Sequence, residues 1–107
     1  MALSKMSDSD RGIIFECLIA AARGPFFNDA DLRILFGLGR SELLGIVGRI
    51  PRLDDSEPNV RRAIGYTLLN LLRYPHGKNA EWRNWISVSR AMVEQVDARW
   101  AALLPGE

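Results

Sequence analysis

His76 is the residue best suited to chemistry near neutral pH. It is the only histidine among the 107 residues, and histidine is the side chain whose ordinary pKa lies closest to neutrality. A catalytic histidine also needs a nucleophile, a carboxylate or another polar group within reach. The candidates for that role are Asp54, Asp55, Asn70 and Tyr74. No spacing among them requires any of them to meet His76.

The residues around His76 favour a structural interpretation. Tyr74-Pro75-His76-Gly77 follows a long apolar-striped segment and is typical of a helix stop. Arg73 and Lys78 flank it, and cations are favourable at the negative end of a helix. We therefore expect no catalytic residue, and a ligand-binding or active site around Tyr74 and His76 remains an alternative.

The other potential ligands form no metal or cofactor pattern. Cys17 is the only cysteine, so a disulfide within the chain and a multi-cysteine zinc site are both excluded. Asp29 and Asp31 lack the remaining ligands of a calcium loop. Gly37-Leu38-Gly39 lacks the third glycine and the lysine of a phosphate-binding loop. We expect no metal and no cofactor, and Cys17 as an inert core residue.

Composition predicts an ordinary globular protein. The chain is 48% apolar and 25% charged, with a net charge of +1, which argues against disorder and mildly against nucleic-acid binding. Residues 1–10 lack the pattern of a signal peptide, and the longest apolar run, 13–22, is too short for a membrane span. We expect a cytoplasmic location.

The elements that would position these residues are all helical. We expect a disordered tail over 1–7 and a single all-α domain over 8–105, an irregular bundle of about five helices. Stop and start signals place helices near 8–23, 29–36, 42–50, 56–73 and 80–104. The last of these contains a β-branched and serine-rich stretch, 86–89, that could break it in two.

Several details of these helices are specific enough to test. Asn28 is placed to cap the second helix, with a hydrophobic staple between Phe27 and Leu32. Gly45 and Gly48 weaken the third helix, so we expect a neighbouring helix to approach closely there. The first helix is apolar on most faces, which predicts that it is either central in the core or covered by another chain.

The segment 29–50 also resembles the spacing of a helix-turn-helix, with Gly37 near the turn. A recognition helix must present polar side chains to base edges. The second helix here offers only Arg40, Ser41, Glu42 and Arg49. A nucleic-acid-binding regulator that uses segment 29–50 is therefore our alternative interpretation.

Apolar surface in excess of what a monomer needs to bury is the main functional indication. Phe26 and Phe27 are adjacent, so both cannot follow one inward direction, and Trp85 is offset from the inward stripe of the final helix. Exposed aromatic groups of this kind favour association with another protein.

We therefore predict a small non-catalytic protein that acts through protein–protein association, as an adaptor, inhibitor or regulatory subunit. Its partner would be another protein or a second copy of the chain, in a homodimer, with nucleic acid unlikely and no membrane. The expected partner-binding residues are aromatic anchors and arginines at their rim: Phe26, Phe27, Arg61, Arg62, Arg73 and Trp85.

Overall fold

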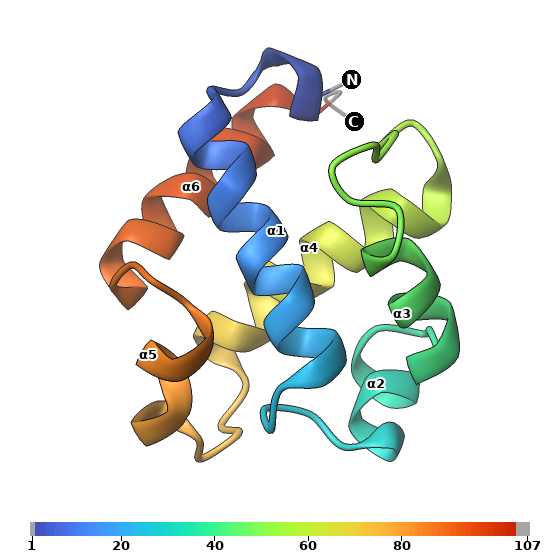
Figure 1. Cartoon of the computed structure of the whole chain (residues 1–107), viewed down its shortest axis with the longest axis vertical. Coiled ribbons are helices and arrows are strands. Elements are labelled where there is room, and N and C mark those ends of the chain that lie inside the picture. Colours follow the sequence, from blue (N-terminus) through green and yellow to red (C-terminus); the bar gives the residue numbers. More distant parts are fainter. Residues whose placement is uncertain (1, 105–107) are drawn as a thin grey trace.

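Six α-helices and two short 3₁₀ helices make up the part of the chain that the computed structural model describes, residues 2–104 (Figure 1). In chain order they are η1 (Leu3–Lys5), α1 (Asp8–Arg23), α2 (Asp29–Leu35), α3 (Arg40–Val47), α4 (Pro58–Arg73), η2 (Asn79–Glu81), α5 (Trp82–Trp85) and α6 (Arg90–Leu103). These residues contain no β-strand. The predicted all-α irregular bundle is confirmed, and its radius of gyration of 12.7 Å fits a single compact unit.

The first helix lies at the centre of the bundle. Helix α1 contacts α3, α4, α5 and α6, and Figure 1 shows these helices on both sides of it. Its buried residues fall on most of its faces and include Ile14, Leu18 and the three alanines 20–22. The sequence left open whether neighbouring helices or another chain covers α1, and the structure favours the neighbouring helices.

The start of the chain packs against the bundle. Leu3 is 3% exposed, and Ala2 and Met6 are also buried. The N–H of Leu3 donates to Oδ2 of Asp55, which is itself buried. The prediction of a disordered tail over 1–7 is therefore wrong for residues 2–7, because three of them supply core surface. Residues 1 and 105, where that tail begins and the predicted domain ends, lie outside the described residues.

Helix starts follow the local capping chemistry. The Asn28 side chain accepts from the Asp31 N–H at 2.8 Å, and the Asp31 carboxylate accepts from the Asn28 N–H in return. This capping box confirms the predicted N-cap of α2. Helix α4 begins at Pro58, where the missing N–H of proline costs no helical hydrogen bond.

The final segment is broken at the stretch that the sequence had marked. Helices α5 and α6 are separated by residues 86–89, and the Ser89 side chain caps α6 by accepting from the Met92 N–H. Ile86 is buried at the break, and Trp82 is half-buried and packs against the core.

The expected close approach at Gly45 and Gly48 is wrong. A methyl group at Gly45 would meet nothing within 4 Å, and one at Gly48 would meet only the preceding turn of its own chain. The close approach occurs instead at Gly65 in α4, where a methyl group would lie 3.3 Å from the Trp100 ring. The absence of a side chain at Gly65 therefore lets α6 pack against α4.

The two neighbouring leucines Leu68 and Leu69 provide a test of this packing. Leu68 is fully buried, whereas Leu69 is 44% exposed. Leu68→Ala should lower the free energy of unfolding by about 2–5 kcal/mol, since it removes buried methyl groups and leaves a cavity. Leu69→Ala should change it by less than about 1 kcal/mol. Urea unfolding followed by circular dichroism measures both, and equal losses would contradict this placement of α4.

Candidate functional site

Phe26 and Phe27 are not exposed anchors. Each is 2% exposed, so the expectation that this pair forms a contact surface is wrong. The loop between α1 and α2 folds back over the core, and the two rings reach different neighbours. Phe26 packs in a T-shaped arrangement with Trp82, and Phe27 does so with Phe36. Side-chain direction in a loop is not bound to one helical face, which is why both rings can be buried.

His76 is held between these two phenylalanines. Its ring centroid lies 5.1 Å from that of Phe26 and 6.1 Å from that of Phe27. Nδ1 accepts from the Lys78 N–H at 3.0 Å, and Nε2 lies 3.2 Å from the Leu71 carbonyl oxygen. Burial lowers the pKa of His76 below 6.5. Both ring nitrogens are therefore occupied by the backbone that ends α4.

Tyr74 is engaged separately from His76. Its hydroxyl donates to Oδ1 of Asp31 at 3.1 Å, and this bond raises the pKa of the tyrosine. The carboxylate that Tyr74 meets is thus on α2. Neither Asp54 nor Asp55 hydrogen-bonds to His76 within the described residues. The geometry does not assemble Tyr74, His76 and a carboxylate into one reactive group.

Arg40, the first of the residues proposed to read DNA, is turned into the fold. Its guanidinium donates to the Ala22 carbonyl at 2.6 Å and to the Phe27 carbonyl at 2.7 Å, and it pairs with Asp29. Arg49 is paired with Glu57. Ser41 remains exposed. The two cations on which the helix-turn-helix interpretation relied have partners within this chain.

The remaining sequence candidates lie apart. Trp85 is half-buried on α5, where its ring would lie 3.2 Å from a methyl group at Gly24. Figure 1 places α5 and α2 on opposite sides of α1. Arg61 donates to the Asp55 carbonyl and faces the start of the chain. Trp85 and Arg61 therefore do not share a surface with Arg62.

Arg62 and Arg73 do belong to one face of α4. Together with Tyr66 and Leu69 they recur at intervals of four, three and four residues, which is one line along a helix. All four are exposed, Tyr66 at 40% and Leu69 at 44%. The sequence analysis missed Tyr66 and Leu69. They could have been found, because both fall outside the inward stripe at 60, 63, 64, 67, 68, 71 and 72.

Helix α2 runs beside this line. Tyr74 bonds to Asp31 near the start of α2, the Tyr66 ring lies 6.4 Å from that of Phe36 just past its end, and Arg62 approaches Gly37. Along the chain, residue 34 on α2 and residue 69 on α4 both fall between these contacts. Ile34 is 81% exposed, the most of any large apolar residue described.

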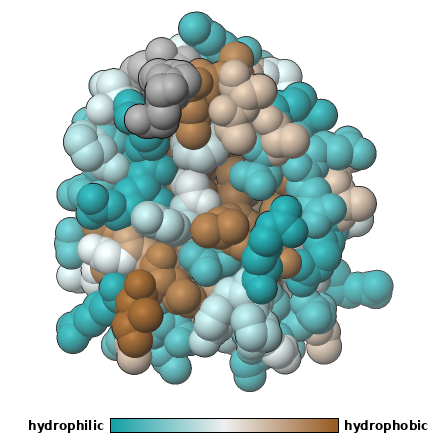
Figure 2. All heavy atoms as spheres, turned by 180° about the vertical axis from the view of Figure 1, so that it is seen from behind, coloured by the Kyte–Doolittle hydropathy of each residue, from teal (hydrophilic) through white to brown (hydrophobic). Residues whose placement is uncertain are grey.

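We call these residues the α2–α4 face. It consists of exposed apolar side chains and exposed arginines on the two helices: Ile34, Tyr66 and Leu69, with Arg33, Arg62 and Arg73. Figure 2 shows brown apolar side chains at the centre and lower left of the rear surface, in the region of α4 and α2. Within residues 2–104, Arg33 and Arg62 form no ion pair, so their charges are available to a partner.

Other chemistry is sparse in the part of the chain described. No three His, Cys, Asp or Glu residues among 2–104 are grouped to hold a metal ion. Cys17 is fully buried, and burial raises its pKa to about 12, so its thiol stays protonated. None of the described helices is long and apolar enough to cross a bilayer. Searches of family models, of curated proteins and of solved structures find no match to this chain.

The role of Arg40 can be tested through stability. Arg40→Ala removes two hydrogen bonds from a charged donor to backbone carbonyls, so the free energy of unfolding should fall by about 1–3 kcal/mol. Arg62→Ala is the matched control and should cost less than about 0.5 kcal/mol. Chemical unfolding of the two variants shows whether the Arg40 side chain stabilises the fold or is free to contact a partner. A fully stable Arg40→Ala protein would contradict this assignment.

The lowered pKa of His76 predicts a pH dependence of stability. The unfolded chain takes up a proton near pH 6.5, whereas the folded chain does so only at lower pH. The stability gained from neutral His76 is therefore present above pH 6.5 and is lost as the pH falls through the folded-state pKa. Urea unfolding at intervals between pH 7.5 and 5 should show this decline. A His76→Gln variant should show a flatter profile, and identical profiles would contradict the argument.

Proposed function

We propose that the protein acts by binding another protein, and that the α2–α4 face is its binding surface. The single observation that carries the proposal is Ile34, which is 81% exposed on α2, while Leu69 and Tyr66 are exposed on α4, which α2 meets at both of its ends. An exposed apolar centre with a charged rim is the usual anatomy of a protein interface. The proposal keeps Arg62 and Arg73 from the sequence analysis and replaces Phe26, Phe27, Arg61 and Trp85.

The chemistry of the rim favours an acidic partner. Arg33, Arg62 and Arg73 are exposed around the apolar centre. Asp31 on α2 is occupied by Tyr74 and by the Asn28 backbone, and Asp97 on α6 lies close enough to Arg73 for the arginine to act on the pKa of that carboxyl, so Arg33 and Arg62 are the freer cations of the rim. Charges of opposite sign across an interface speed association and suppress wrong partners. The occupant that fits best is an amphipathic helix with leucine-like residues on one side and glutamate or aspartate beside them.

Two other occupants fit less well. A symmetric dimer through this face would bring the same arginines together, and like charges across an interface are unfavourable. A nucleic acid would pair with the arginines, but it offers phosphates and sugars to Ile34 and Leu69, whose side chains are purely aliphatic. The apolar centre is thus the feature that separates a protein partner from a nucleic acid.

The test uses a designed helical peptide with a leucine stripe flanked by glutamates, and a second peptide with lysines at the same flanks. Fluorescence anisotropy should show saturable binding of the glutamate peptide and little binding of the lysine peptide. Leu69→Glu and Ile34→Glu should each weaken binding at least tenfold, about 1.4 kcal/mol. Met92→Glu is the control, because Met92 is 38% exposed but lies on α6.

Four results would overturn the proposal. Equal affinity for both peptides would remove the role of charge. Unchanged binding by Leu69→Glu and Ile34→Glu would place the interface elsewhere. A dimer in sedimentation that Leu69→Glu dissociates would make a second copy the occupant, and a single-stranded oligonucleotide that outcompetes the peptide would indicate nucleic acid.

A further inference from the structure

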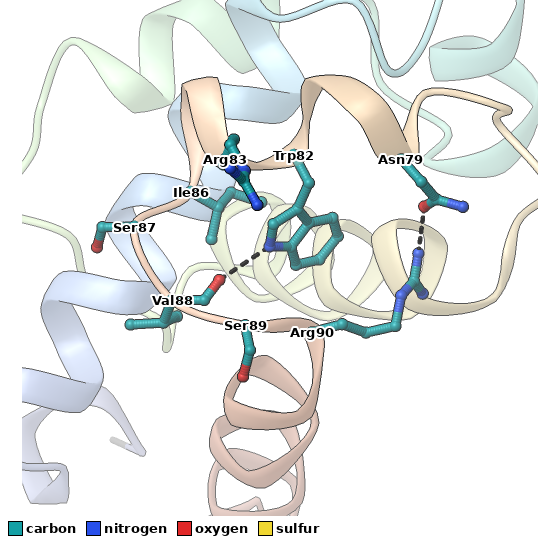
Figure 3. Close-up of a pocket in the computed structure, with 8 residues that line it drawn as sticks. All are labelled: Asn79, Trp82, Arg83, Ile86, Ser87, Val88, Ser89 and Arg90. Carbon is teal, nitrogen blue, oxygen red and sulfur yellow. Dashed lines mark hydrogen bonds between the residues drawn. The ribbon is translucent and has the colours of Figure 1, made fainter.

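A second site lies between α5 and the start of α6, away from the α2–α4 face. It is an open pocket of about 430 Å³, within the range of small-molecule sites. Figure 3 shows the Trp82 side chain projecting from α5 into this pocket, with Arg83 on one side of the ring and Arg90 on the other. The lining contains two arginines and no carboxylate, and the Glu16 carboxylate bonds to Ser87 from outside it.

The walls of this pocket are fixed by the fold. Trp82 Nε1–H donates to the Val88 carbonyl at 2.9 Å, which sets the plane of the indole. The Ser87 N–H and hydroxyl both donate to Glu16 on α1, at 2.8 and 2.9 Å. These bonds fix the conformation of the loop at residues 86–89. A ligand would therefore bind to a preformed pocket, and less binding free energy would be spent on ordering the protein.

Arg90 is part of the same framework. Its Nη1 donates to the Leu72 carbonyl at 2.6 Å and its Nη2 to Oδ1 of Asn79 at 2.7 Å. Its guanidinium carbon lies 5.0 Å from the centre of the Trp82 ring, a cation–π distance. Arg90 therefore keeps its positive charge at the pocket, while Nη1 serves the end of α4 and Nη2 serves Asn79.

Arg83 is the exception among the polar side chains of the lining. Asn79, Trp82, Ser87, Ser89 and Arg90 each have a hydrogen-bond partner within the fold. Arg83 is exposed and makes no hydrogen bond or ion pair with any residue from 2 to 104. A guanidinium group presents a planar set of donors that matches a phosphate or a carboxylate.

We propose that this pocket binds a small organic phosphate monoester, with the phosphate on Arg83 and the organic part against Trp82 and Val88. Two cations without a carboxylate favour a dianion over a monocarboxylate. The half-buried Trp82 and Val88 supply apolar contact that inorganic phosphate cannot use. This site is independent of the proposed protein interface, because none of its lining residues belongs to the α2–α4 face.

The probe is phenyl phosphate, titrated into ¹⁵N-labelled protein and followed by NMR. The Trp82 indole N–H, the Arg83 Nε–H and the backbone of residues 86–90 should shift together and saturate. Phenyl phosphate should bind at least threefold more tightly than inorganic phosphate or benzoate. Phenol should cause no saturable shift, because it has no charge to pair with Arg83.

Substitutions at Arg83 test whether its side chain binds the phosphate. Arg83→Gln should weaken phenyl phosphate at least tenfold, and Arg83→Lys should recover part of the loss by restoring the charge. Arg52→Gln is the control, because Arg52 is an exposed arginine in the loop before α4. The dispersion of the backbone spectrum reports that each variant is folded.

Several results would overturn the proposal. One is the absence of saturable shifts at 10 mM phenyl phosphate. Another is equal weakening by Arg83→Gln and Arg52→Gln, which would indicate nonspecific attraction. If benzoate binds as tightly as phenyl phosphate, the pocket has no preference for a dianion. If inorganic phosphate binds as tightly as phenyl phosphate, contact with Trp82 contributes nothing to affinity.

Discussion

The burial of α1 is the constraint on which the rest of the structure depends. A helix that is apolar on most faces cannot lie at the surface, so other elements must surround it. The small side chains of Ala20, Ala21 and Ala22 let neighbours come close at its carboxyl end, while Ile14 and Leu18 fill the centre. Helices α3, α4, α5 and α6 all contact α1. Exposed faces are therefore left only on the sides of these helices that point away from it.

Surrounding one helix with short segments creates many helix ends, whose last carbonyls need partners. Arginines supply several of them. Arg40 reaches the Ala22 carbonyl in the last turn of α1, Arg90 reaches Leu72 in the last turn of α4, and Arg11 reaches Leu3 and Met6 near η1. A guanidinium group suits this role because it donates in several directions at once. Three of the 14 basic residues of the chain thus have a structural role, before any partner is considered.

The sequence predicted local features well and tertiary ones less well. The Asn28 cap and the break at 86–89 depend on neighbouring residues, and both were predicted or anticipated. The burial of Phe26 and Phe27 depends on a loop folding back to His76, which no local pattern encodes. Gly45 and Gly65 show the same limit, since only the three-dimensional arrangement decides which glycine a neighbouring helix approaches. The site was predicted in part, because Arg62 and Arg73 were chosen without Tyr66 and Leu69.

The net charge of +1 conceals how the charges are distributed. Four arginines are neutralised by ion pairs within the chain, so they are not free to bind a partner. The pairs are Arg11–Asp8, Arg40–Asp29, Arg49–Glu57 and Arg99–Asp10. The Asp10 pair is the most protected of the four, and Arg99 holds the pKa of that carboxyl below its usual value. Arg33 and Arg62 beside the apolar α2–α4 face, and Arg83 beside Trp82, have no such partners within residues 2–104. An overall charge near zero thus argues only against binding driven by the field of the whole protein. It is compatible with the two proposed sites, each of which combines apolar surface with guanidinium groups that lack an ion pair within residues 2–104.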